Sequence, residues 1–305
     1  STKESACGTN GIPYSAYKAL PEVCAQVFTN HTKVLSSSVQ PLGLEAFNVQ
    51  KVWFAPKGVH DEDSRAVVRA PDQLRTIFGG NTDSKIISGA VGSVITNATL
   101  EATPSCQRGF CRGRQLSLNI VDLDSYMRAF NSIARYDRIA DKIGSIPCLA
   151  LYDFCNAFPT LLHTWLFLAL QCMGLPVLRN VVWWLYTDVT AYSCGTGDGS
   201  FLFRVLGGVK TGCPLSSLLF LLGLNPIVDL FLLLCDGPKL SMTRVCADDF
   251  GSALSALRYL RRQASIFRVA ARAAGLHLKP AKCILVISGC ELTEDLKLAI
   301  LAWLR

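Results

Sequence analysis

Two adjacent carboxylates, Asp248 and Asp249, follow Met242-Thr243-Arg244-Val245-Cys246-Ala247 inside an otherwise apolar stretch of the chain. Two like charges a few ångströms apart do not both ionise readily unless a cation lies beside them. Hard divalent cations such as Mg²⁺ take oxygen ligands, so this pair is a candidate metal site. An Asp-Asp pair by itself is also typical of a simple hairpin turn, and the rest of the sequence has to distinguish the two interpretations.

A third carboxylate, Asp153, ends the apolar run Cys148-Leu149-Ala150-Leu151-Tyr152, which is typical of a strand. The sequence predicts further strands at 243–247, 250–253 and 284–287, with a basic helix over 256–274. The order strand, helix, strand, strand, helix, strand is the split βαβ arrangement of an α+β sheet. In that arrangement the strand before Asp153 lies beside the central hairpin, so we expect Asp153 to meet Asp248 although they are 248 − 153 = 95 positions apart. The alternative is that Asp153 caps the turn that follows it.

The segments upstream predict a second group of elements. Short strands are expected at 52–55 and 74–78, and helical apolar spacing begins at residue 82. Further helices are expected over 116–130 and 160–173, and a hairpin with a glycine-rich loop at 195–199 is expected over 192–205. Residues 1–45 show weak periodicity and are interpreted as an N-terminal extension without a fold prediction.

The composition narrows the class of protein. The 305 residues are 50% apolar and 17% charged, which excludes global disorder and allows one large domain or two modest ones. The net charge of +7 is compatible with a polyanionic partner. Thirteen cysteines without any CxxC pair indicate reduced intracellular thiols, with Cys106 and Cys111 as packing residues. We expect an intracellular protein, in the nucleus or cytoplasm and without excluding an organelle, because residues 1–5 are polar and show no apolar segment of a secretory signal.

One apolar segment, 218–235, has the length of a membrane span. Asn225, Pro226 and Asp229 interrupt it, and a charge near the middle of a span is costly. The sequence therefore favours a buried helix that bends or ends at Pro226 and is followed by a second helix, with no membrane partner.

Several motifs in a fixed order over about residues 52–287 resemble those of reverse transcriptases. The likeness to the four palm motifs lies in Asp153-Phe154-Cys155-Asn156-Ala157-Phe158, Gly208-Val209-Lys210-Thr211-Gly212-Cys213-Pro214-Leu215-Ser216-Ser217, Cys246-Ala247-Asp248-Asp249, and Gly275-Leu276-His277-Leu278-Lys279-Pro280-Ala281-Lys282-Cys283. Gln107-Arg108-Gly109-Phe110 with Gly113-Arg114-Gln115 is similar to the GF-x-x-GR signature of non-LTR, LINE-type elements. Ala55-Pro56-Lys57-Gly58 and Leu74-Arg75-Thr76-Ile77 resemble the nucleotide-gripping fingers.

The resemblance implies an α+β right-hand polymerase with fingers and palm. The expected divisions are an N-terminal extension at 1–45, fingers at 46–145, a palm with part of the fingers inserted at 146–290, and the start of a thumb at 291–305. The palm would hold a split βαβ, ferredoxin-like antiparallel sheet flanked by helices. The implied activity is that of a retroelement-derived RNA-directed DNA polymerase, a nucleotidyltransferase that adds dNTPs to a DNA primer on an RNA template.

The implied chemistry is in-line displacement at phosphorus assisted by two Mg²⁺ ions, with Mn²⁺ as an alternative. Asp153, Asp248 and the backbone carbonyl of Phe154 would hold the metal, and Asp249 would contribute less directly. Lys57 and Arg75 would hold the triphosphate, because charge-assisted bonds suit phosphate. Further dNTP contacts would come from Phe154, from Phe158, which would exclude a 2′-hydroxyl, and from Gly212, Pro214 and Lys282.

The expected nucleic-acid contacts lie in two basic segments and one loop. They are Arg108, Arg112, Arg114, Thr211, Arg258, Arg261 and Arg262, with Arg268 and Arg272 on the same helix. Each of these side chains has a simpler interpretation as a solvated surface group, as do Lys57 and Arg75, and Phe158 alone would be interpreted as core.

The chain departs from the family at three positions and at its end. Thr211 replaces a glutamine, Cys246 replaces an aromatic residue, and Pro159 replaces an aspartate. Arg305 follows the fourth motif too closely to leave room for a full thumb. Two functions therefore stay open: a polymerase core, in a longer parent polyprotein or alone, and a domesticated, catalytically weak or silent subunit with a structural or RNA-binding role in a larger complex.

Overall fold

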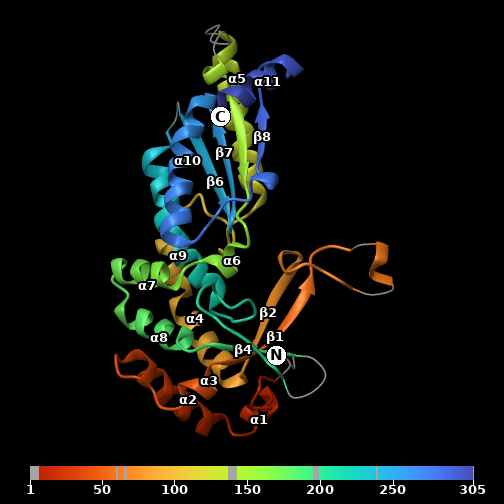
Figure 1. Cartoon of the computed structure of the whole chain (residues 1–305). Helices are drawn as coiled ribbons and strands as arrows, with labels where there is room; N and C mark the ends of the chain where they lie inside the picture. Colours follow the sequence, from red (N-terminus) through yellow and green to blue (C-terminus); the bar gives the residue numbers. More distant parts are fainter. Residues whose placement is uncertain are drawn as a thin grey trace. The chain divides into compact units, whose positions relative to one another are not determined.

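A computed structural model describes residues 7–59, 61–64, 67–136, 143–194, 199–237 and 240–304 (Figure 1). The chain forms two compact units. Unit 1 comprises Ser1–Thr96 and Leu161–Phe220, and unit 2 comprises Asn97–Thr160 and Leu221–Arg305. Two of the three boundaries between the units fall inside helices, α4 (Thr82–Ala102) and α9 (Ser216–Leu234), and the third lies between Thr160 and Leu161. The division into fingers, palm and thumb stays a prediction.

The sheet of unit 1 has the strand order β2-β1-β4-β5. Its strands are β1 (Val49–Pro56), β2 (Leu74–Gly80), β4 (Thr190–Ser193) and β5 (Phe201–Arg204). The β1–β2 and β4–β5 pairs are antiparallel, which confirms the predicted strands and hairpin, although residues 195–198 of the predicted loop lie outside the described residues. The parallel β1–β4 pairing was not predicted, because no local pattern links strands so far apart in sequence.

The helices described wholly within unit 1 are α1 (Tyr14–Ala19), α2 (Pro21–Ser36), α3 (Leu44–Phe47), α7 (His163–Cys172) and α8 (Pro176–Tyr186), with 3₁₀ turns at Asp61–Ser64 and Pro71–Gln73. The helix expected over 160–173 is confirmed as α7, whereas the sequence did not predict α1, α2, α3 and α8. α2 packs against α8, and Trp184 Nε1 donates a hydrogen bond of 2.9 Å to the carbonyl of Ser37. A proline begins both α2 and α8, a first-position preference that could have revealed them.

The sheet of unit 2 has the order β6-β7-β3-β8, and all its pairs are antiparallel. Its strands are β3 (Cys148–Tyr152), β6 (Ser241–Cys246), β7 (Asp249–Leu254) and β8 (Ile284–Ile287). The expected adjacency of β3 and the central hairpin is confirmed, because β3 pairs with β7 along its whole length.

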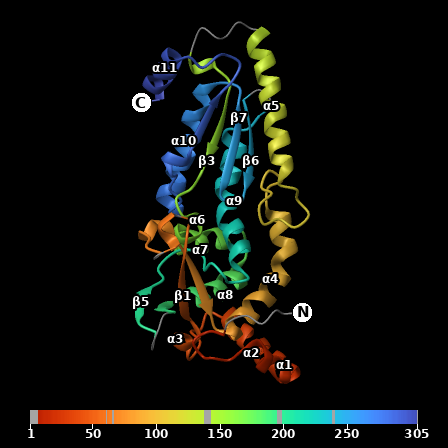
Figure 2. The same ribbon diagram turned by 90° about the vertical axis from the view of Figure 1, so that its right-hand side faces the viewer.

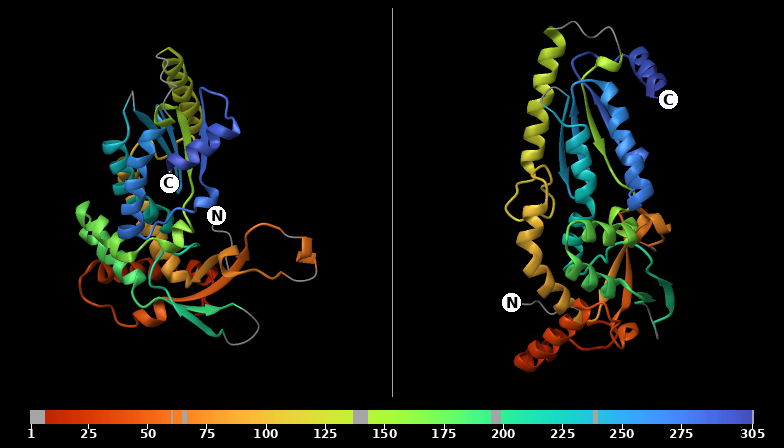
Figure 3. Two further views of the ribbon diagram at one scale, coloured as in Figure 1. Left: turned by 45° about the horizontal axis from the view of Figure 1, so that its top comes forward. Right: turned by 90° about the vertical axis from the view of Figure 1, so that its left-hand side faces the viewer.

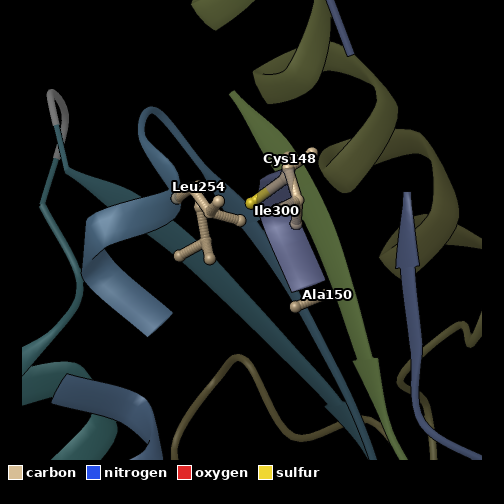
Figure 4. Packing of buried hydrophobic residues seen from close by; sticks show 5 residues of the cluster. Cys148, Ala150, Leu254 and Ile300 are labelled. Atoms are coloured by element: carbon tan, nitrogen blue, oxygen red, sulfur yellow. The ribbon is translucent and has the colours of Figure 1, made fainter. Parts of the chain in front are cut away.

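Helices cover both faces of this sheet (Figures 2 and 3). On one face, Leu123, Met127 and Phe130 of α5 (Ser117–Tyr136) pack with Ala253. On the other face, Ile300 of α11 (Glu294–Leu304) packs with Cys148, Ala150 and Leu254 (Figure 4). That face is also covered by α10 (Leu260–Val269), and shorter turns lie at Ile143–Ser145, Ala157–Thr160 (α6), Leu257–Tyr259, Ala270–Ala274 and Pro280–Lys282.

Helix α9 passes through Pro226 without ending, so the expected second helix was wrong. By length and composition α9 could cross a membrane. However, 56% of its apolar segment is buried inside the protein, as in the core helix of a globular protein. Leu219, Phe231 and their neighbours are fully buried, and this burial offsets the hydrogen bond that proline cannot donate. The Asn225 side-chain amide donates to the carbonyl of Ala102 and to the hydroxyl of Thr103.

All thirteen cysteines lie in the described residues and are free thiols. Cys106 and Cys111 are 4% and 6% exposed, which confirms their interpretation as packing residues. The cellular compartment inferred from the cysteines stays a prediction.

Candidate active site

The register of the unit 2 sheet brings the three aspartates together. Tyr152 pairs with Phe250, so the same register continued by one residue places Asp153 opposite Asp249. Asp248 lies in the two-residue loop before Asp249, because Cys246 pairs with Asp249 across the hairpin. Asp153 and Asp248 are half-buried and Asp249 is exposed.

The pKa values of two of these carboxyl groups reflect their proximity. Burial raises the pKa of Asp248, and the charges of Asp249 and Asp153 raise it further, while its backbone hydrogen bond and Lys282 act in the opposite direction. Burial also raises the pKa of Asp249, followed by the charge of Asp153, again against Lys282. The three carboxylates and Lys282 therefore form one interacting group within unit 2.

Lys282 is the fourth member of this group. Its Nζ lies 2.8 Å from Asp153 Oδ2, and its side chain is 61% exposed. The adjacent backbone is fixed, because the amide of Lys279 donates to the carbonyl of Asp153 at 2.8 Å. The structure thus pairs Lys282 with Asp153, and its expected dNTP contact stays a prediction.

The donor chemistry of this group suits a hard cation, but the present arrangement is not a complete ligand set. Among the described residues there is no group of three or more His, Cys, Asp or Glu side chains in metal-binding geometry. Mg²⁺ needs only one or two protein carboxylates when water and substrate phosphates supply the rest. An exposed ion pair such as Asp153–Lys282 contributes roughly 0–1 kcal/mol, so a divalent cation can displace it. Asp153, Asp248 and Asp249 fit the ion by this criterion.

The raised pKa values predict how the stability of the metal-free protein depends on pH. A carboxyl whose pKa is higher in the folded than in the unfolded state stabilises the fold below its unfolded pKa, and this contribution is lost as pH rises through the folded pKa. The free energy of unfolding of the wild type should fall between about pH 4 and pH 7, and we expect this fall to be smaller in Asp249→Asn. The measurement is urea unfolding in EDTA. The matched control is Glu291→Gln, at an exposed carboxyl outside the helices and strands. An identical pH slope for wild type and Asp249→Asn would contradict the expectation.

A buried segment of unit 2 lies against the Asp248 loop. The amide of Arg108 donates to the carbonyl of Val245 at 2.9 Å, and a Cβ on Gly109 would lie 2.0 Å from the nitrogen of Ala247. The side chain of Gln107 is hydrogen-bonded to the same alanine. The segment matched to the GF-x-x-GR signature therefore contacts the loop. Nothing in the local sequence marks Gln107 for this role, because its partner is 140 positions away.

Arg108 and Arg114 have internal partners, and their expected nucleic-acid contacts stay predictions. The Arg114 guanidinium donates four hydrogen bonds of 2.7–2.9 Å to backbone carbonyls at and just beyond the end of α4. It thereby caps a helix C-terminus, where unpaired carbonyls and a partial negative charge favour a cation. Arg108 forms an ion pair of 2.8 Å with Asp122, which also binds Arg244 at 2.7 Å. Burial alone would raise the pKa of Asp122, but bonds from the two arginines outweigh it and lower that pKa.

The role of Arg114 predicts a large effect on stability. Arg114→Met should lower the free energy of unfolding by on the order of 3 kcal/mol, because several carbonyls lose a charged donor. The exposed Arg112 is the matched control, and Arg112→Met should leave the urea midpoint unchanged. Equal midpoints for the two variants would show that Arg114 does not cap α4.

The two phenylalanines of the first motif have different surroundings. The ring of Phe154 is 4% exposed and packs edge-on against Phe250 and Phe267, at centroid distances of 5.7 Å each. Its side chain belongs to the core, and only its carbonyl keeps the predicted metal role. Phe158 lies in α6 and contacts Phe110 edge-on at 5.6 Å. Its predicted selection against a 2′-hydroxyl remains untested.

The remaining predicted dNTP residues lie in unit 1. Arg75 on β2 pairs with Ala55, and the amide of Lys57 donates to the carbonyl of Gln73, so Lys57 and Arg75 lie at one end of the β1–β2 hairpin. The loop that contains Thr211, Gly212 and Pro214 is hydrogen-bonded to the other end of β2.

Two contacts fix this loop. The amide of Phe78 donates to the carbonyl of Thr211 at 2.8 Å. Gly212 has φ +106°, and a Cβ there would lie 2.7 Å from the Phe78 carbonyl, so only glycine fits.

Lys210, beside this loop, was not predicted to have a role. Its side chain is completely buried: Nζ donates to the carbonyl of Leu185 at 2.8 Å and lies 4.7 Å from the ring centre of Tyr186. Burial lowers the pKa of Lys210. A motif match alone does not separate such a buried lysine from a surface one.

The arginines of α10 and the turn before it are exposed, as expected. Ile266 and Phe267 are buried on the opposite face of the helix. The guanidinium of Arg258 lies 5.0 Å from the ring centre of Tyr259, and that of Arg261 lies 4.7 Å from that of Trp303. A solvated basic face and a phosphate-binding face both remain compatible with this arrangement, for these arginines and for Arg262.

Comparison with known proteins defines the fold of the chain. No protein-family model matches it, and no curated protein is similar to it in sequence. Solved structures of telomerase do share its architecture. Apo telomerase from Candida tropicalis, truncated from its C-terminal domain, matches 84% of this chain with a TM-score of 0.57 and 11% identity. Telomerase from Candida albicans in complex with the TWJ fragment of telomeric RNA matches 93% of it with a TM-score of 0.56 and 13% identity.

The chain spans about half the length of these telomerase structures, 53% and 50% respectively. At such low identity the likeness establishes the fold alone. The chain is a mixed α/β protein with two sheets and a reverse-transcriptase-like polymerase fold.

Proposed function

We propose that this chain is an RNA-directed DNA polymerase core, derived from a non-LTR retroelement, that adds dNTPs to a DNA primer on an RNA template. The observation that carries the proposal is the convergence of Asp153, Asp248 and Asp249 at the end of the β3–β7 pair, within a reverse-transcriptase-like fold. Burial and neighbouring charge raise the pKa of Asp248 and of Asp249, which is unfavourable for stability alone, and a cation resolves the conflict.

The residues of the chain would divide the work of nucleotidyl transfer. Asp153 and Asp248 would hold two Mg²⁺ ions, together with the Phe154 carbonyl, and Asp249 would add negative charge beside them. Bound there, the ions would polarise the phosphate and activate the primer hydroxyl. Lys282, once released from Asp153, would be a mobile cation next to the triphosphate. Lys57 and Arg75 on the β1–β2 hairpin would hold its outer phosphates.

The proposal is tested by primer extension on an RNA template with a DNA primer, all four dNTPs and Mg²⁺. We expect extension that EDTA abolishes and that added Mg²⁺ or Mn²⁺ restores. Extension that persists in EDTA would contradict the metal assignment. Absence of extension with every divalent ion, while RNA binding persists, would contradict the enzyme assignment.

A second function, that of a domesticated RNA-binding or structural subunit in a larger complex, is favoured by one observation. The Asp153–Lys282 ion pair satisfies the first carboxylate without any metal. RNA binding that is insensitive to EDTA, with no extension, would support this second function. The structurally similar telomerase from Candida albicans is in complex with RNA, which supports a nucleic-acid partner under both proposals. An intracellular location stays a prediction.

A further inference from the structure

The hairpin loop that carries Asp248 has a strained backbone. Only two residues, Ala247 and Asp248, connect the paired positions Cys246 and Asp249. Ala247 has φ +57°, whereas Asp248 is not among the residues with positive φ. Positive φ at the first loop position alone is the pattern of a type II′ turn, and glycine normally occupies that position. A non-glycine residue is strained there, so surrounding contacts must hold it in place.

The side chain of Gln107 supplies such contacts. Its Nε2 donates to the carbonyl of Ala247 at 2.9 Å, and its Oε1 accepts from the amide of Ala247 at 2.8 Å. Both backbone polar groups of the strained residue are therefore bound by one side chain. The same Oε1 also accepts from the amide of Gly109 at 2.8 Å, and Gln107 is 0% exposed.

The segment around Gln107 is itself fixed on several sides. Its neighbours continue a ladder with β6, because Val245 donates to the carbonyl of Cys106 and Arg108 donates to that of Val245, each at 2.9 Å. The carbonyl of Gln107 accepts from Arg114 at 2.7 Å. The side-chain amide of Gln107 is therefore attached to backbone that has little freedom to shift relative to the loop.

We propose that Gln107 is a positioning residue: it holds Ala247 in the left-handed conformation and thereby aims the Asp248 carboxylate toward Asp153 and Asp249. Gln107 touches no reacting group and acts through the backbone of the loop. Its catalytic consequence rests on the proposed polymerase function, whereas its effect on the loop does not.

Glutamine suits this position because its amide offers a donor and an acceptor at once. Methionine has a similar length and neither polar group, so Gln107→Met removes all three bonds with little change in volume. A glutamate at this fully buried position beside other carboxylates would be protonated, so it keeps an acceptor for the amides of Ala247 and Gly109 and a hydroxyl donor for the Ala247 carbonyl. Gln107→Glu should therefore restore part of what Gln107→Met loses.

The test measures amide hydrogen exchange by mass spectrometry in the segment 243–250 of the metal-free protein. We expect this segment to be protected in the wild type and to exchange at least about tenfold faster in Gln107→Met, with Gln107→Glu between them. The matched control is Asn225→Leu, which removes two hydrogen bonds of another buried amide in unit 2 without touching the loop. It should lower the urea midpoint and leave exchange in 243–250 at the wild-type level.

Primer extension gives the second readout. We expect Gln107→Met to lower kcat by about 10- to 100-fold with a smaller change in KM for dNTP, because a misplaced carboxylate affects the transition state more than nucleotide binding. Asn225→Leu should retain the wild-type kcat.

The outcomes separate the inference from the function on which it rests. Rapid exchange of 243–250 in the wild type, or equal acceleration by Gln107→Met and Asn225→Leu, would overturn the positioning role. A wild-type kcat in Gln107→Met would overturn its catalytic consequence. If the wild type extends no primer while Gln107 still controls exchange, the polymerase proposal fails and the role of Gln107 in the loop stands.

Discussion

Replacement of Asp248 by asparagine is expected to lower primer extension on the order of 10³-fold or more, because it removes a metal-binding carboxylate at which charge develops in the transition state. The same change should stabilise the metal-free protein at neutral pH. Burial and the neighbouring carboxylates raise the pKa of Asp248, so its ionised form destabilises the fold once pH exceeds that pKa. A gain in stability with a loss of activity marks a residue kept for chemistry.

The measurements are steady-state primer extension and thermal unfolding in EDTA at pH 7. Glu291→Gln, at an exposed carboxyl outside the helices and strands, should leave both quantities unchanged. RNA affinity should be the same in both variants and in the wild type. Asp248→Asn that destabilises the metal-free protein and still extends primers would show that Asp248 has only a structural role.

The second large effect is expected at Gly109. A Cβ at this position would lie 2.0 Å from the nitrogen of Ala247 and 2.7 Å from its Cα, both of them backbone atoms. The Asp248 loop would have to move, so Gly109→Ala should lower the free energy of unfolding by about 3 kcal/mol or more. A displacement of about 1 Å at the catalytic carboxylate would lower kcat by about 10²-fold in addition.

Gly92 provides the control, because its replacement by alanine is expected to stabilise the protein. Gly92 lies inside α4, where a Cβ would make ordinary contacts of 3.7 Å with Leu215 and Leu218. Gly92→Ala should therefore stabilise the protein by roughly 0.5–1 kcal/mol through helix propensity. If urea unfolding gave Gly109→Ala the stability of the wild type, the close approach of Gly109 to the loop would be wrong.

The carboxylate group could be predicted from sequence because each of its parts has a local signal. Apolar runs predicted β3 and the central hairpin, and Asp153 and Asp248 stand at their ends, where a strand pairing rule places them together. The strands β1 and β2 beside Lys57 and Arg75 were predicted for the same reason. In each case the apolar pattern that predicts a strand lies within about ten residues of the chain.

The partners of the predicted residues could not be predicted in this way. Arg114 looks like an exposed basic residue in a glycine-rich loop, and its role as a cap depends on where α4 ends. Lys282 faces Asp153 only because β8 pairs with β3. Helix α9 continues through Pro226 because tertiary burial outweighs the local preference of proline. These outcomes depend on long-range packing, which a local pattern does not contain.

The most direct test of the central claim is a Mn²⁺ titration of the free protein followed by electron paramagnetic resonance, with wild type and Asp248→Asn compared at pH 7. We predict saturable binding by the wild type and at least about tenfold weaker binding by Asp248→Asn, because the ion loses one of its principal oxygen ligands. Equal Mn²⁺ affinity in the two proteins, or none in the wild type even with dNTP present, would contradict the claim that Asp153, Asp248 and Asp249 form a divalent-cation site.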